Sequence, residues 1–111
     1  MGNTWVTNIQ HFLNEEGEIA DLPRPALNLA NHFTSIIEEV TCSNNEYEPQ
    51  TTKINCRRRP KRKKCAGKIA AYINKENPNQ IIWYCPVCDD NGVITGWEST
   101  IYNNLRSSEF N

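Results

Sequence analysis

The chain has 111 residues and a net charge of −1, and 38% of its residues are hydrophobic and 23% charged. This composition is typical of one globular domain and is too apolar for general disorder. No apolar run is long enough for a membrane helix, and the N-terminus lacks both a signal-peptide pattern and the myristoylation pattern, because Val6 stands where Ser or Thr is required. These features predict a cytoplasmic protein.

The small net charge hides a strong segregation of charge along the chain. Residues 1–50 carry one basic and eight acidic side chains, whereas residues 51–75 carry ten basic side chains and no acidic ones. Residues 76–111 carry one basic and five acidic side chains. Such asymmetry bears on partners rather than on the fold.

The first predicted element is a strand over residues 4–13, which are rich in aromatic and β-branched side chains. The turn residues Glu15-Glu16-Gly17-Glu18 follow it, so an N-terminal hairpin or strand-turn is expected. We expect His11 to be a solvent-facing or half-buried strand residue rather than a metal ligand, since histidine is intermediate in burial.

The second predicted element is an amphipathic helix. Asp21 followed by Pro23 and Pro25 is typical of a helix start, because Asp is a common N-cap and proline is tolerated in the first turn. His32 lies at the edge of the apolar stripe and is expected to be packed or exposed rather than a ligand. The apolar stripe, at three- and four-residue spacing, consists of Ala26, Leu29, Ala30, Phe33, Ile36, Ile37 and Val40.

The second half of the chain predicts short strands separated by turns. Residues 75–79 form one turn, and Asp89-Asp90-Asn91-Gly92 contains the Asn-Gly pair that favours a hairpin. Turns at such short spacing favour an antiparallel meander over a parallel sheet. The predicted strands are 51–56, 68–74, 80–84 and 93–100.

We therefore expect a single α+β domain over residues 1–111, with one amphipathic helix packed on an antiparallel sheet. Its expected parts are a strand, turn and helix at 1–41, a linker at 42–50, a metal-binding sheet region at 51–101 and a tail at 102–111.

Four of the five cysteines are spaced as two pairs, Cys56 with Cys65 and Cys85 with Cys88. In a reducing cytosol, such cysteines are more often metal ligands than disulfides. The predicted hairpin over residues 68–84 would bring the pairs together, because its two strand bases adjoin Cys65 and Cys85. Cys42 is expected to be a free or buried thiol, although it or a histidine could replace one ligand.

The four cysteines predict a structural Zn²⁺, with iron as the next choice. Four protein ligands leave no open coordination position, which argues against zinc hydrolysis. A thiol redox activity of Cys85 and Cys88 has little support, because no βαβ setting surrounds them. No catalytic constellation stands out, so we expect that the protein is not an enzyme.

These cysteines resemble those of the zinc ribbon family. Cys85-Pro86-Val87-Cys88 is similar to its second knuckle, and Cys56 with Cys65 is similar to an expanded first knuckle. The resemblance covers about residues 54–100 and implies a three-stranded antiparallel sheet with a structural zinc. The whole chain, from Trp5-Val6-Thr7 to Gly92-Val93-Ile94-Thr95-Gly96-Trp97, also resembles a group of small uncharacterised bacterial proteins.

Between Cys56 and Cys65 lies a run of seven cations in eight positions. Held at both ends by a metal site, it would contact phosphates of a nucleic acid. The alternatives are a solvated loop, or a loop that docks on an acidic partner or on the acidic N-terminal region of its own chain. The candidate nucleic-acid-binding residues are Arg57, Arg58, Arg59, Lys61, Arg62, Lys63, Lys64, Lys68 and Tyr84.

Exposed aromatic rings beside these cations would form a stacking platform for a single strand. Trp83 and Trp97 are expected in the core, whereas Tyr84 lies on the opposite strand face from Trp83 and is the better candidate for contact. The sequence thus predicts a zinc-stabilised nucleic-acid-binding module, with a protein-interaction or scaffold module as the alternative. It does not distinguish DNA from RNA or specify an oligomeric state.

Overall fold

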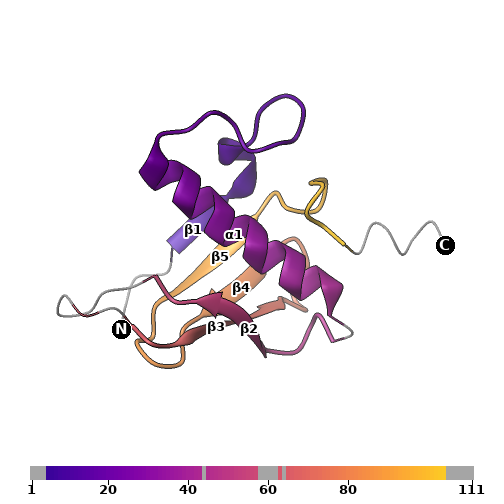
Figure 1. Cartoon of the computed structure of the whole chain (residues 1–111). Helices are drawn as coiled ribbons and strands as arrows, with labels where there is room; N and C mark the ends of the chain where they lie inside the picture. Colours follow the sequence, from indigo (N-terminus) through magenta and orange to yellow (C-terminus); the bar gives the residue numbers. More distant parts are fainter. Residues whose placement is uncertain (1–4, 44, 58–62, 64, 105–111) are drawn as a thin grey trace.

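A computed structural model describes residues 5–43, 45–57, 63 and 65–104. One α-helix lies across one face of a five-stranded sheet with strand order β1-β5-β4-β3-β2 (Figure 1). The predicted α+β class is confirmed. The elements are β1 (Trp5–Asn8), a 3-10 helix η1 (Ile9–Phe12), α1 (Arg24–Cys42), β2 (Gln50–Asn55), β3 (Lys68–Ile73), β4 (Ile81–Tyr84) and β5 (Asn91–Thr95).

The predicted meander forms the larger part of the sheet. β2, β3, β4 and β5 pair antiparallel in chain order. β1 adds a strand that the sequence did not predict in this place: it pairs parallel to β5, with Trp5 opposite Gly92. The sheet therefore contains the three antiparallel strands that the zinc ribbon resemblance implied, with β2 and β1 added at its two edges.

The predicted N-terminal strand is wrong beyond Asn8. The Asn8 side chain accepts a hydrogen bond from the Gln10 N–H at 3.0 Å, and the chain turns there into η1. Ile9 is thereby buried against the core, and the exposed His11 belongs to η1 rather than to a strand. The expected turn at residues 15–18 is present, and an isolated antiparallel bridge between Leu13 and Ile19 closes it.

The predicted helix is present, but its start differs in detail. Pro23 is the N-cap residue and no side chain caps the helix, so the prediction of Asp21 as the cap is wrong. Proline in the first turn fits the prediction, because a first-turn residue has no intrahelical acceptor for its N–H. The buried apolar residues of α1 belong to the predicted stripe: Ala30, Phe33, Ile36, Ile37 and Val40.

Side-chain alternation along the strands separates two faces of the sheet. The face toward α1 forms the core with the helix stripe, and it carries the buried Trp83 (4% exposed). The other face carries half-buried side chains such as Tyr72, Ile82 and Tyr84. The remaining strand residues of the core face are Ile69, Ala71, Ile73, Ile81 and Ile94.

The predicted Asn-Gly hairpin turn is wrong. Asn91 and Gly92 lie inside β5, opposite Tyr84 and Trp83, and the chain reverses earlier, between Cys85 and Asp90. The cysteine turn already supplies this reversal, since the Asp89 N–H donates to the Cys85 carbonyl at 2.9 Å. The predicted strand 93–100 accordingly starts two residues earlier, and it ends at Thr95, before Gly96 with its positive φ of 72°.

Within the described residues, no helix combines the length and the hydropathy needed to cross a membrane.

Candidate metal centre

Two strand connections place the four paired cysteines at one end of the sheet. Cys56 and Cys65 lie in the β2–β3 connection, directly after β2 and shortly before β3. Cys85 and Cys88 lie in the β4–β5 connection. Because neighbouring strands are antiparallel, the end of β2, the start of β3 and the end of β4 adjoin one another. The strand register therefore brings together residues up to 32 positions apart.

The sulfur atoms form a tight group. The Sγ atoms of Cys56 and Cys88 are 3.6 Å apart, as are those of Cys65 and Cys85, and all four lie within 4.8 Å of one another. A disulfide requires about 2.05 Å, so these are thiols and not bridges. Four sulfurs at about 2.3 Å around one tetrahedral metal ion would be about 3.8 Å apart. The four cysteines could therefore bind one metal ion.

Backbone N–H groups point at these sulfurs. The Gly67 N–H donates to Cys65 Sγ at 3.4 Å. Burial opposes ionisation of Cys85, but hydrogen bonds from the N–H groups of Cys88 and Val87, together with those of the Cys65 and Cys88 thiols, outweigh it and lower the pKa of Cys85. Such bonds favour thiolates, whereas crowding four thiolates together disfavours them. A bound cation resolves this conflict, because it offsets the mutual repulsion of the sulfurs.

Gly67 fits into the metal centre only because it has no side chain. A Cβ atom there would lie 2.6 Å from Cys85 Sγ and 2.9 Å from Val87 Cγ2. The Gly67 carbonyl also accepts a hydrogen bond from the Cys56 N–H at 2.9 Å, which ties the two cysteines of the first pair together. The paired cysteines are the visible signal of this site, whereas this glycine two residues after Cys65 is recognised only in the structure.

The other candidate ligands lie apart from the sulfur group. Cys42 is exposed at the end of α1, and in the described part of the chain neither it nor a histidine belongs to the group. His32 is half-buried against the Phe33 and Trp83 rings, at 5.6 and 6.2 Å between centroids. Burial, helped by the charge of Arg57 and opposed by that of Asp90, lowers the pKa of His32 to about 4.

Several of the predicted nucleic-acid-binding residues lie beside the sulfur group. Arg57 directly follows Cys56 and is exposed, as are Lys63 and Lys68, the first residue of β3. Tyr84, the last residue of β4, is half-buried on the face opposite Trp83. Trp83 and Trp97 are 4% and 3% exposed, as their expected core positions require. Arg58, Arg59, Lys61, Arg62 and Lys64 lie outside the described residues.

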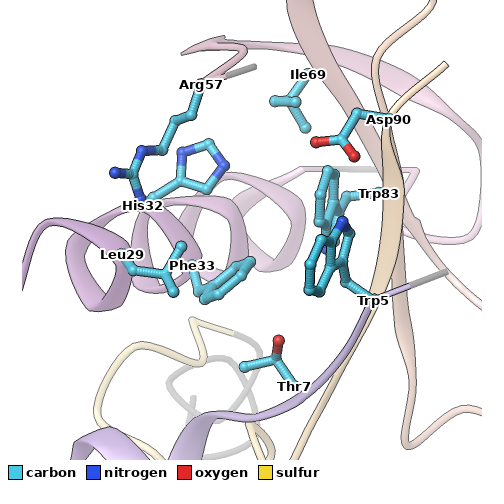
Figure 2. A pocket seen from close by; sticks show the side chains of 9 residues that line it. All are labelled: Trp5, Thr7, Leu29, His32, Phe33, Arg57, Ile69, Trp83 and Asp90. Atoms are coloured by element: carbon cyan, nitrogen blue, oxygen red, sulfur yellow. The ribbon is translucent and has the colours of Figure 1, made fainter. Parts of the chain in front are cut away.

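A cavity of about 330 Å³ adjoins the metal centre on the helix side of the sheet. Figure 2 shows its lining side chains, which come from β1, α1, β3, β4 and the residues flanking the cysteines. Sequence reasoning missed this cavity, because no local pattern joins these segments. The lining includes Trp5, His32, Phe33, Arg57, Trp83 and Asp90.

Comparison of the chain with protein-family models, with curated proteins and with solved structures gave no match. The resemblances to the zinc ribbon family and to small bacterial proteins therefore have no support from these comparisons.

Proposed function

We propose that Cys56, Cys65, Cys85 and Cys88 hold a structural zinc ion. Four thiolates within 4.8 Å of one another suit zinc first, because zinc takes four sulfur ligands tetrahedrally, and iron is the competing metal. The burial of three of the four cysteines supports a structural role. Because four protein ligands fill a tetrahedral site, we assign the ion no catalytic task.

We further propose that the protein is a nucleic-acid-binding module whose basic segment, residues 57–64, contacts phosphates. The observation that carries this proposal is the anchoring of that segment: the cysteines at its two ends belong to one sulfur group. Seven cations are thus confined to a short segment between two fixed points. Fixing the ends lowers the conformational entropy lost when cations line up on a phosphate backbone.

The open face of the sheet supports the same proposal. Tyr72 follows the core residue Ala71 on β3, and Tyr84 follows the core residue Trp83 on β4. Because side chains alternate along a strand, both tyrosines lie on the face away from α1. Lys68 follows the same alternation on β3 and lies at the metal end of this face. Half-buried aromatic rings beside cations are the elements of a single-strand stacking platform.

The test compares two variants that each lose three cations. Replacing Arg57, Arg58 and Arg59 with Ala should weaken binding of a labelled single strand and reduce the slope of log affinity against log salt by about 2. Replacing Arg24, Lys53 and Lys75 removes the same charge from positions outside the segment and should change both quantities much less. Fluorescence anisotropy over a salt series measures affinity and slope together.

Both variants should keep the zinc-dependent melting temperature of the parent, because none of the replaced side chains is a ligand. Equal losses in the two variants would show a general charge effect and contradict the assignment of the segment. The scaffold alternative would be favoured by two results together: the parent has no affinity for nucleic acid, and the first variant still binds a protein partner. An acidic partner lost in that same variant would place the scaffold interface on the basic segment.

A further inference from the structure

We propose that the cavity beside the metal centre holds one nucleobase, with guanine preferred, of the single strand whose phosphates contact residues 57–64. This inference rests on the proposed nucleic-acid function and assigns it a base-reading site. Trp5, Phe33 and Trp83 supply the aromatic walls, and Arg57 and Asp90 supply opposite charges.

The size and walls of the cavity suit a flat heterocycle. Its volume of about 330 Å³ is at the lower end of the range for small-molecule sites. Trp5 is 55% exposed on the edge strand β1, where an indole face remains available for stacking. Phe33 and Trp83 form the buried part, with ring centroids 6.1 Å apart.

A buried donor in this wall lacks an acceptor. The Trp83 indole N–H is buried, and among the described residues it has no hydrogen-bond partner. It lies over Gly92, where a Cβ would be only 2.6 Å from Nε1, so the indole depends on the bare glycine backbone. Because this N–H has almost no accessible surface and packs over Gly92, a ligand in the cavity would contact the indole ring of Trp83 rather than its N–H. By contrast, the Trp97 indole N–H donates to the Asn79 carbonyl at 3.0 Å.

The charged side chains define which base fits best. Figure 2 shows the Arg57 side chain beside His32 above α1, and the Asp90 carboxylate on the sheet side near Trp83. A carboxylate only accepts hydrogen bonds and a guanidinium only donates them. Guanine offers two adjacent groups of each kind: its N1–H and N2 amino group can donate to the two oxygens of a carboxylate, and its O6 and N7 can accept from an arginine, whereas adenine has a single amino donor group.

The position of Arg57 links the cavity to the basic segment. Arg57 lines the cavity and is also the first residue of that segment. A base that enters from this side leaves its own phosphate at the segment, where the other cations are concentrated. This continuity favours a base within a strand over a free neutral metabolite of similar size.

The experiment uses oligothymidine strands that differ only at one central position, which holds guanine, adenine or no base. At fixed salt the guanine strand should bind about tenfold more tightly than the abasic strand, the size of effect that one stacked and hydrogen-bonded base contributes. Asp90→Asn and Arg57→Gln should each reduce this ratio to about twofold, because both change the polar groups of the cavity. Lys75→Gln, at the opposite end of the β3–β4 pair, should keep the full ratio.

Equal affinities for the guanine and abasic strands, with a normal salt dependence, would overturn the cavity site and leave the phosphate contacts standing. If no strand binds, guanosine monophosphate is added to the ¹⁵N-labelled protein and the Trp83 indole N–H signal is followed. A shift of that signal, absent in Asp90→Asn, would retain the cavity site and reject the proposed nucleic-acid function. An unchanged signal would reject both.

Discussion

At one end of the β3–β4 pair the chain closes on itself through hydrogen bonds, whereas at the other end it brings four sulfur atoms together. The first end is the turn at residues 74–80. There the Asn74 N–H donates to the Gln80 carbonyl at 3.0 Å, and the two amide side chains bond to each other at 3.1 Å. The Asn79 carbonyl accepts from Trp97, which joins this turn to the segment after β5.

At the metal end, backbone hydrogen bonds also close the connections, from the Cys85 N–H to the Asp90 carbonyl at 2.8 Å and from the Cys56 N–H to the Gly67 carbonyl at 2.9 Å, but four thiols remain crowded together there. Its ligands come from two connections, and the polar groups that approach them are backbone N–H groups aimed at sulfur. The turn end is therefore complete without any further component, while at the metal end a bound cation would offset the repulsion of four crowded thiolates. Hydrogen-bond protection and stability at the two ends should therefore respond differently to metal removal.

Loss of the metal should have the largest effect. Cys85→Ser removes a buried ligand, and we expect it to lower the free energy of unfolding by about 4 kcal/mol or more, the linkage contribution of a ligand present at a thousandfold excess over its Kd. A chelator should lower the melting temperature of the parent to a similar extent. Cys42→Ser changes an exposed thiol outside the sulfur group, so this variant should keep the free energy of unfolding of the parent and its sensitivity to the chelator.

Elemental analysis of the purified protein, combined with thiol counting, checks this prediction and separates zinc from iron. Hydrogen exchange locates the effect: amides next to the cysteines should lose protection on metal removal, while those of the turn at residues 74–80 should keep more of it. A melting temperature indifferent to chelation would contradict a structural metal. Uniform loss of protection would contradict the contrast between the ends.

Crowding the metal centre from within should have the next largest effect. In Gly67→Ala the new methyl group would meet Cys85 Sγ at 2.6 Å, so either the ligand or the backbone must move. We expect about 2 kcal/mol of destabilisation, within the range for overpacked cores, together with weaker metal binding. Urea denaturation and competition with a metal indicator measure the two effects.

Gly17→Ala is the matched control for this change. Gly17 has a φ of 82° with nothing near its missing side chain, so alanine there introduces backbone strain alone. It should cost about 1 kcal/mol while leaving metal affinity unchanged. Equal metal affinity in the two variants would show that Gly67 does not shape the centre.

The sequence predicted the metal end better than the rest of the site because its signals are local. The spacing of Cys85 and Cys88 and the short hairpin between Cys65 and Cys85 sufficed to predict that the four sulfurs would lie together. The helix stripe was predictable for the same reason, since its period is visible within one segment.

The cavity and the parallel strand could not be predicted, because both depend on contacts between distant segments. Trp5 pairs with Gly92 across almost the whole chain, and no local pattern specifies that partner. Gly92 itself was misleading: beside Asn91 it suggests a tight turn, but its small size serves the packing of the Trp83 indole. Glycine is favoured both in a tight turn and under a large ring, and at position 92 it serves the second purpose.

The smallest expected effect on stability is a pH dependence from His32, a residue of α1 whose ring packs against Trp83 of β4. Its pKa is lowered to about 4 by burial and, to a smaller extent, by Arg57, whereas an unfolded histidine titrates near 6.5. Between these values the unfolded chain binds more protons, so stability should be complete above about pH 6.5 and decline toward pH 4. Because the ring is only half-buried, we expect about 1–2 kcal/mol from this residue.

Denaturation curves from pH 7 to pH 4 should separate His32 from the cysteines. Acid also protonates thiolates and releases metal, but that loss is common to the parent and to His32→Phe, which keeps an aromatic ring against Phe33 and Trp83. The free energy of unfolding of the parent minus that of His32→Phe should therefore isolate the imidazole, and it should fall as the pH drops below 6.5. His11→Phe changes an exposed residue and should follow the parent at every pH. Parallel curves for the parent and His32→Phe would contradict the lowered pKa and would mean that Asp90 offsets the effects of burial and of Arg57.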